Sequence, residues 1–350
     1  MATKINKNIA LVILAYIVVY VVWGSTYFFI EKALNSFTPF VLGSLRFILA
    51  SIILMGYCKI KGYKLFNKKI VLQSAFIGFL LLFVDMAAII WAEQHISSGV
   101  AAIIVAAAAI WFVILDKPRW KYNFKSVPVI TGVLFGFLGV VMLFAEQIMK
   151  TTGGNDKSTN TIALIVLIIG SIAWTVGSLC SKYMRKNTSR KEPDLNVMVK
   201  TAWQMITAGI LFTLVALLDG EYAQFKIAEV APVDWFNLLY LVTFGSILAF
   251  SSYIWLLQVR PAMEVSTYAY VNPIIALILS HFFTSHHVTM LQVYGLIIIL
   301  SSVLLMNWNL YKNSKPVRTI AEFCKKGLRF ATDQIEHITK SGISEKVDKY

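Results

Sequence analysis

The dominant pattern along the chain is a series of long apolar runs separated by short polar connections. A helix needs about 20 mostly apolar residues to cross about 30 Å of hydrocarbon, since it rises about 1.5 Å per residue. The runs predict ten transmembrane helices, at residues 9–30, 39–58, 70–92, 97–115, 127–145, 161–181, 197–218, 233–257, 263–284 and 289–310. Little is left for a soluble domain, so the pattern predicts an all-α integral membrane protein.

Several polar and aromatic motifs occur twice, in the same order. "YVVWGSTYFFIEK" (20–32) is similar to "SIAWTVGSLCSKY" (171–183), and "AAIIWAEQ" (87–94) is similar to "SSYIWLLQ" (251–258). Five helices is an odd number, so a second copy would enter the membrane from the opposite side. We expect two inverted five-helix repeats, residues 8–145 and 161–310, joined by an extracytoplasmic linker at 146–160. Chance similarity between apolar helices is the alternative.

Composition and charge agree with a membrane protein. Hydrophobic residues make up 58% of the 350-residue chain and charged residues only 14%, whereas soluble domains are about a quarter charged. The mean hydropathy is +0.69. The net charge is +14, but with a cytoplasmic N-terminus 26 of the 32 Lys and Arg residues fall in cytoplasmic segments. This bias predicts a multi-pass cell-membrane protein with both termini in the cytoplasm. The positive charge is therefore explained by membrane topology and does not indicate nucleic-acid binding, although it can attract anionic membrane lipids.

Motifs for catalysis or cofactor binding are absent from the sequence. Cys58, Cys180 and Cys324 fall near the predicted cytoplasmic side and have no disulfide or metal-binding spacing. No phosphate-binding loop, zinc-protease helix or nucleophile elbow occurs. The first apolar run is also too long for a signal peptide and has no convincing cleavage site. We expect no enzyme, no metal and no cofactor.

Two charged residues lie well inside the predicted spans, Arg46 and Asp85. From the start of its span, Arg46 lies about 10 Å below the outer edge of the membrane, and Asp85 reaches a similar depth from the other direction. Such residues need a partner or water, so they concentrate where helices face each other or a cavity. One interpretation is a structural ion pair between them. The other is coupling, in which Asp85 binds and releases a proton or cation.

Aromatic, hydroxyl and amide side chains form the second candidate group. Large rings give contact area for a small solute, and polar tips orient it. We expect the substrate site to draw on Trp23, Ser25, Thr26, Trp91, Trp174, Tyr253, Tyr268, Tyr270 and Asn272. An alternative explains the Trp and Tyr residues near span ends equally well, namely that they anchor the helices at the membrane–water interface without contacting substrate. At Asn272-Pro273, the proline either exposes backbone groups to a ligand or only kinks the helix.

Two further segments carry predictions about packing. Gly132, Gly136 and Gly139 form a small-residue face that predicts a close helix contact, within the chain or between subunits of a homo-oligomer. The basic tail, residues 311–350, has apolar residues near helical spacing, which favours an amphipathic helix on the inner membrane surface. A loose solvated tail and a partner-binding segment are the alternatives.

The chain resembles the EamA-type family of the drug/metabolite transporter superfamily. The resemblance rests on "WGSTYFFIEKAL" followed by Pro39 and "LRF" (45–47), on "AEQHISSGVAAII" (92–104) and on "STYAYVNPIIALIL" (266–279). It implies ten helices in two inverted repeats, a central cavity and transport of small metabolites. One departure is "AAAAI" (106–110), where the family usually has a proline.

We therefore expect a secondary transporter, working as an exporter, that moves a small-molecule substrate such as an amino acid or a related amphipathic solute. Alternating access would occur around a central aromatic-polar cavity, with proton coupling as an option. Strongly anionic substrates would require more intramembrane Lys or Arg than Arg46 alone. An intramembrane enzyme or lipid-handling protein would need paired acids or a His/Asp group at one depth. A non-transporting scaffold would have a closed interior.

Overall fold

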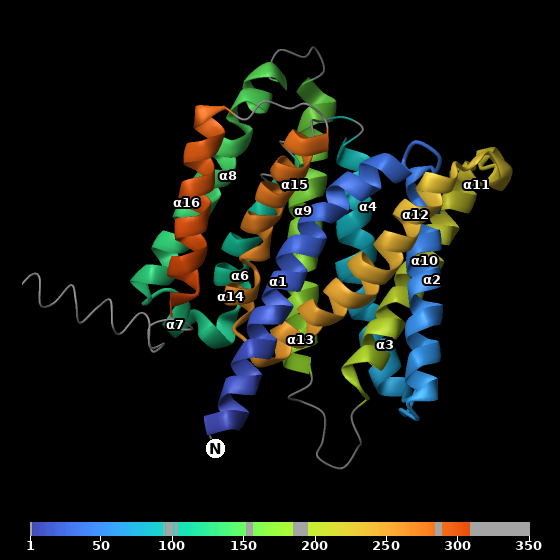
Figure 1. Ribbon diagram of the computed structural model, residues 1–350, viewed down its shortest axis with the longest axis horizontal. Coiled ribbons are helices and arrows are strands. Elements are labelled where there is room, and N and C mark those ends of the chain that lie inside the picture. Colours follow the sequence, from blue (N-terminus) through green and yellow to red (C-terminus); the bar gives the residue numbers. More distant parts are fainter. Residues whose placement is uncertain are drawn as a thin grey trace, which may run out of the picture.

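The computed structural model describes residues 2–93, 95, 101, 104–151, 157–184, 195–283 and 289–308, and every regular element within these ranges is a helix. In chain order they are α1 (Ala2–Ala33), α2 (Pro39–Ile60), α3 (Lys68–Gly78), η1 (Phe79–Val84), α4 (Asp85–Glu93), α6 (Ala108–Leu115), η2 (Lys117–Arg119), α7 (Trp120–Asn123), α8 (Val127–Thr151), α9 (Lys157–Tyr183), α10 (Val197–Leu218), α11 (Glu221–Gln224), η4 (Ile227–Glu229), α12 (Pro232–Tyr240), η5 (Leu241–Phe250), α13 (Ser251–Val259), α14 (Ala262–Val265), α15 (Tyr268–Phe283) and α16 (Met290–Met306). The predicted all-helical class is confirmed (Figure 1). The predicted tail, 311–350, lies outside the described residues.

Among the described residues, eight helical stretches are long and apolar enough to cross a membrane. They are Ile9–Ala33, Pro39–Ile60, Lys68–Ala92, Val127–Ala145, Thr161–Tyr183, Val197–Leu218, Pro232–Val259 and Ala262–Leu279. Where spans were predicted at 97–115 and 289–310, the structure has shorter apolar helices, Ile104–Leu115 and Met290–Met306. Helices α8 and α9 extend to 151 and from 157, so the described part of the predicted linker is helical.

A backbone N–H group at a helix end that lacks a hydrogen bond is costly near hydrocarbon. Side chains accept hydrogen bonds from such groups at several helix starts in this protein. Helix α2 begins with a proline at its first turn, and the carboxylate of Glu221 accepts hydrogen bonds of 2.9 Å from the next two N–H groups. Gly220 has a φ of +72°, a left-handed conformation that suits glycine, and turns the chain from α10 into α11 where Glu221 reaches α2. At α16, Thr289 and Gln292 form a capping box.

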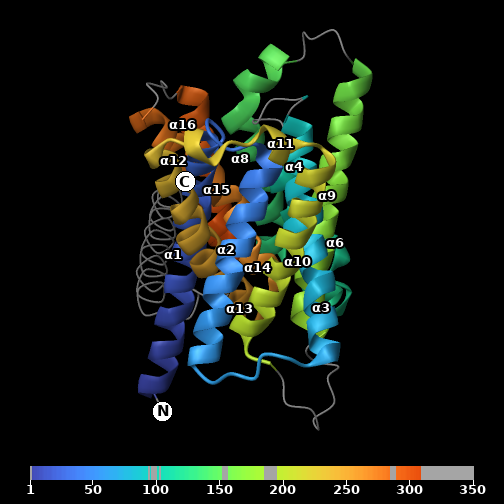
Figure 2. The same cartoon turned by 90° about the vertical axis from the view of Figure 1, so that its right-hand side faces the viewer.

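The helices pack in pairs that connect the first and second halves of the chain. Helix α2 packs along α10, and α8 along α16. Between these pairs lie α1, which contacts α15 and η5, and α9, which contacts α6 and η1 (Figures 1 and 2). We call the end of the bundle where α1 begins the N-terminal face. Helices α2, α9 and α13 end at this face, and α3 and α10 begin there.

The glycines of α8 form the close contact that the sequence predicts. An added Cβ at Gly132 would lie 2.6 Å from Met306 Cγ, and one at Gly139 would lie 2.9 Å from the Gly295 carbonyl oxygen. Both neighbours belong to α16, so the contact lies within this chain. Without side chains at these positions, the two backbones approach closely enough to pack without lipid between them.

Two membrane-spanning helices contain π-helical segments, η1 before α4 and η5 before α13. A π-helical turn makes i→i+5 hydrogen bonds, so it changes the direction in which the following side chains point, and such turns are frequent at functional sites. Asp85 follows η1 directly, and Ser246 lies within η5. Both residues line the cavity described next.

Candidate functional site

A cavity with a volume of about 530 Å³ lies between the helices in the described part of the chain. It is lined by the C-terminal half of α1 and the N-terminal half of α2, so it lies in the half of the bundle away from the N-terminal face. The junctions η1–α4 and η5–α13 and helices α9 and α15 contribute the other walls. This volume falls within the range of about 300–1,000 Å³ that is usual for small-molecule sites.

Four aromatic side chains close the cavity toward the N-terminal face. The ring of Trp23 lies 5.0 Å from Tyr268, 5.1 Å from Tyr253 and 5.7 Å from Trp174, measured between centroids. Trp23 Nε1 also donates a 3.1 Å hydrogen bond to the carbonyl of Gly245. Tyr253 is fully buried and its hydroxyl is 2.6 Å from Ser178 Oγ. We call this Trp23–Trp174–Tyr253–Tyr268 cluster the aromatic floor. Its three cavity-lining members, Trp23, Trp174 and Tyr268, can present ring faces and edges to a solute, and Tyr253 packs against them.

Ser25 and Thr26 are neighbours in sequence but face different surroundings. Ser25 is hydrogen-bonded to Tyr240 at 2.7 Å and is not in the cavity wall, so it joins α1 to α12. Thr26 lines the cavity, and its hydroxyl donates to the Trp23 carbonyl at 2.6 Å. The hydroxyl proton is therefore engaged in the helix, and the methyl group lies near Gly245 of η5.

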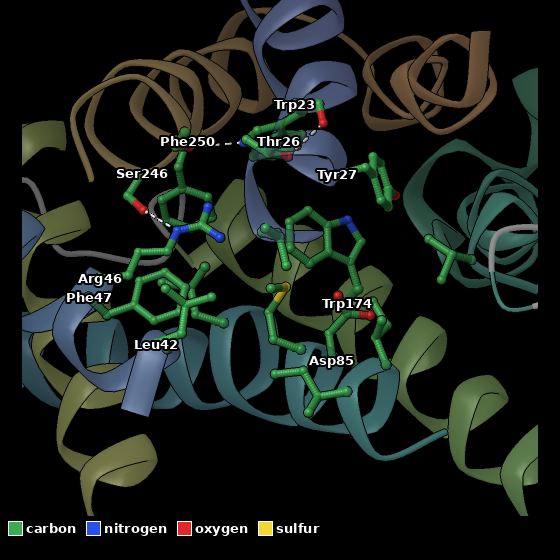
Figure 3. Close-up of a pocket in the computed structure, with 18 of the residues that line it drawn as sticks. Trp23, Thr26, Tyr27, Leu42, Arg46, Phe47, Asp85, Trp174, Ser246 and Phe250 are labelled. Carbon is green, nitrogen blue, oxygen red and sulfur yellow. Dashed lines mark hydrogen bonds between the residues drawn. The ribbon is translucent and has the colours of Figure 1, made fainter. Parts of the chain in front are cut away.

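Arg46 forms one wall of the cavity, on the side of η5 (Figure 3). Its Nε donates to Ser246 Oγ at 2.8 Å, and its guanidinium lies 5.2 Å from the ring centroid of Phe47. Gly245 leaves room for it, since a Cβ there would lie 3.2 Å from Arg46 Nη2. Its terminal nitrogens have no hydrogen-bond or ion-pair partner among the described residues. A fixed guanidinium with free donors suits a carboxylate.

Asp85 lies across the cavity from Arg46, beside Trp174 (Figure 3). Its side chain is only 6% exposed, and within the described ranges no group forms a hydrogen bond or ion pair with its carboxylate. The expected ion pair with Arg46 is therefore not formed in this structure. Chain position gave both residues a similar depth, but Arg46 points toward η5 and Asp85 toward α9, with the cavity between them. A buried carboxylate without a partner is costly, because its charged form has lost water and gained no compensating contact.

Three more cavity-lining polar atoms are buried and have no hydrogen-bond partner in the part of the chain that the structure describes. They are Ser171 Oγ, Trp174 Nε1 and Asn272 Oδ1. Buried polar groups of this kind normally have a partner, so a solute or water is the natural one here. Together they offer donors and an acceptor on the α9 and α15 walls. Helix α15 continues through Pro273, and the break in this span lies earlier, between α14 and α15.

Besides Ser25, three of the expected site residues are not in the cavity wall. Trp91 packs against a small cluster with Ala92 and Ala163 and is not in the cavity wall. Tyr270 is fully buried and donates to the Val133 carbonyl at 3.1 Å, which ties α15 to α8. Tyr253 belongs to the aromatic floor but does not line the cavity. Of the expected set, Trp23, Thr26, Trp174, Tyr268, Asn272, Arg46 and Asp85 meet around one space.

The cavity is also lined by residues that the sequence analysis did not select, among them Phe47, Ser171, Phe212, Ser246 and Phe250. The phenylalanines gave no signal, because one more apolar side chain in an apolar helix is unremarkable. The two serines interrupt apolar runs as Ser25 and Thr26 do, and this signal was present but shared with many packing serines.

No group of three or more His, Cys, Asp or Glu side chains that could hold a metal occurs among the described residues. Two acidic residues line the cavity, the buried Asp85 and the exposed Glu31. The open cavity is also unlike the closed interior expected of a scaffold.

Comparisons with known proteins agree with this geometry. The family described as "EamA-like transporter family" matches residues 10–145 and 161–308. The chain is 32% identical over 269 residues to "Uncharacterized inner membrane transporter YedA" of Escherichia coli K12, covering 76% of this chain and 80% of that protein. "Uncharacterized transporter YvbV" of Bacillus subtilis is 22% identical and covers 87% of this chain and 93% of its own length. A solved crystal structure has a similar fold, with a TM-score of 0.69, 13% identity, and coverage of 86% of this chain and 98% of its own.

Proposed function

Because this chain belongs to the EamA-like transporter family, we propose that it is a secondary transporter that exports small amphipathic metabolites such as amino acids. The observation that carries the proposal is the cavity of about 530 Å³ with Arg46 and Asp85 on opposite walls and aromatic rings between them. A solute with a carboxylate, an ammonium group and an apolar body would match all three features.

Ten membrane helices in two inverted repeats are part of the proposal. The two short apolar helices at 104–115 and 290–306 would complete the count of ten. Packing supports the repeat, because the contacts of α1 with α15 and η5 correspond to those of α9 with α6 and η1. The π-helical segments support it as well, since η1 and η5 occupy the third helix of each half. The charge bias favours cytoplasmic termini at the N-terminal face.

In this orientation the cavity opens away from the cytoplasm, and the aromatic floor closes it toward the cytoplasm. Transport would require the two halves to rock, so that the floor opens while the outer mouth closes. We propose that Asp85 couples this change to ion binding by taking up a proton or a cationic group in one state. The carboxylate would have to be neutralised before the cavity closes around it, since a bare charge in a dry interior is costly.

The test begins with purified protein in proteoliposomes and three probes: a neutral amino acid, its N-acetyl derivative and its methyl ester. We expect uptake of the zwitterion above protein-free vesicles, and much less of either derivative. Arg46→Gln should reduce zwitterion uptake by about 10- to 100-fold, the range for losing a hydrogen bond to a charged group. The control is Glu229→Gln, which changes an exposed carboxylate far from the cavity. Equal accumulation with and without the protein across an amino-acid panel would contradict the proposal.

Coupling is tested separately with Asp85→Asn under an imposed proton gradient that is then collapsed. We expect wild-type accumulation to fall when the gradient collapses and the variant to show no such response. If the variant responds as wild type does, Asp85 is not the coupling group, although the transporter assignment would stand. The direction of transport is determined by comparing the efflux of the amino acid from preloaded cells with and without the protein.

A further inference from the structure

A second, much smaller pocket lies near the N-terminal face, where α3 and α10 begin and α9 and α13 end. Its volume is about 30 Å³, close to the space that one water molecule occupies in the liquid. Six of its ten lining residues have polar side chains, namely Gln73, Ser74, Ser181, Lys200, Gln204 and Gln258. Gln204 is 1% exposed, and its side-chain oxygen has no hydrogen-bond partner among the described residues. Nothing in the packing of an apolar bundle explains such a group.

Four residues that line this pocket correspond, by position in the two halves of the chain, to residues that line the large cavity. Gln204 is the eighth residue of α10, as Arg46 is of α2. The repeated motifs pair Ser181 with Ile30 and Ile254 with Ile90, and each of these four residues lines its respective space. Lys200, the fourth residue of α10, corresponds in the same way to Leu42, which also lines the cavity.

The small pocket is closed in this structure by contacts around it. Helices α3 and α10 touch at Gly78, where an added Cβ would lie 2.4 Å from the Gln204 carbonyl oxygen. The ammonium of Lys182 donates to the carbonyls of Leu257 and Arg260, which fastens the end of α9 to the end of α13. Arg260 also forms an ion pair with Glu264. These are contacts that the two halves would have to release in order to open this end.

We propose that the pocket is the closed form of a second solute site, which opens at the N-terminal face when the large cavity closes and binds the carboxylate end of the solute. Lys200 supplies the positive charge there, and the amide groups of Gln73, Gln204 and Gln258 supply hydrogen-bond donors. The solute would therefore pass from Arg46 to an equivalent polar position on the other side of the aromatic floor. This inference rests on the proposed function, because it requires the two halves to exchange conformations.

The test uses Gln204→Cys in purified full-length protein, which makes both faces accessible. Labelling by an anionic and by a cationic methanethiosulfonate reagent is measured on the peptide that contains residue 204, so the native cysteines need not be removed. The labelling rate with each reagent is divided by the rate of that reagent with free cysteine, which corrects for the different reactivity of the two reagents. We expect slow labelling, accelerated about tenfold by Lys182→Met, which removes two hydrogen bonds that hold the pocket closed. The anionic reagent should be favoured about fivefold, and Lys200→Gln should abolish this preference.

Ser302→Cys is the matched control, because Ser302 is as buried as Gln204 but lies between α8 and α16, away from both spaces. It should label slowly in every background. If Lys182→Met unfolds the protein, Glu264→Gln replaces it, since it breaks the neighbouring ion pair.

Labelling of residue 204 that stays as slow as at residue 302, or that shows no preference for the anionic reagent, would overturn the inference. Proteoliposome uptake by wild-type protein in the same preparations separates this failure from failure of the transporter proposal. Uptake without state-dependent labelling refutes only the second site, whereas absence of uptake over the whole panel refutes the proposed function.

Discussion

Replacing Gly136 by Ala would place a methyl group where α8 packs against both α15 and α16. The new Cβ would lie 2.4 and 2.5 Å from two ring carbons of Tyr270 and 2.8 Å from Ser302 Oγ. Carbon atoms pack best at about 3.5–4.0 Å, so the ring would have to move by about 1 Å. Tyr270 is fully buried and its hydroxyl donates a hydrogen bond to the Val133 carbonyl, so the ring cannot move away without displacing its neighbours. Overpacking of this kind costs about 1–3 kcal/mol.

Gly56→Ala is the matched control, because Gly56 is also in a helix interior but has no atom within 4 Å of an added Cβ. Both substitutions gain the same helix propensity, about 1 kcal/mol, so the difference between the two variants isolates the steric cost. We expect Gly136→Ala to be less stable than Gly56→Ala by about 1–3 kcal/mol.

The free energy of unfolding is measured by SDS titration of the protein in mixed micelles, followed by far-ultraviolet circular dichroism. The double variant Gly136→Ala/Tyr270→Leu should lose less unfolding free energy than the sum of the losses of the two single variants, because the smaller leucine leaves room for the new methyl group. If Gly136→Ala and Gly56→Ala unfold at the same SDS fraction, the close contact between α8, α15 and α16 is not present in the membrane.

Two further substitutions test single hydrogen bonds. Glu221→Ala removes the carboxylate that caps α2 and should cost about 1–2 kcal/mol in the same SDS titration, whereas Glu229→Ala, at an exposed ion pair, should cost less than about 1 kcal/mol; equal losses would contradict the capping role. Trp23→Phe keeps a ring in the aromatic floor but leaves the Gly245 carbonyl without its donor, so we expect a loss of about 1–3 kcal/mol and reduced proteoliposome uptake. Wild-type stability in this variant would show that the hydrogen bond contributes nothing.

Local features of the sequence were sufficient for the membrane character and for most helix positions. The thickness of the hydrocarbon fixes the length of a span, so apolar runs alone locate the helices to within a few residues. The glycine spacing of α8 likewise predicted a close contact, because only small residues let two helices approach in lipid. Arg46 and Asp85, which the sequence places inside apolar spans, both line the cavity.

The direction of each side chain around its helix axis was decided only by tertiary packing. Chain position gives the depth of a residue in the membrane, but not which neighbour it faces. Hence Arg46 and Asp85, at similar depth, stand on opposite walls instead of forming an ion pair. For the same reason Ser25 bonds to Tyr240 while Thr26 lines the cavity. Successive helix residues point about 100° apart, so the sequence defines the set of candidates, and the packing of ten apolar segments selects those that meet.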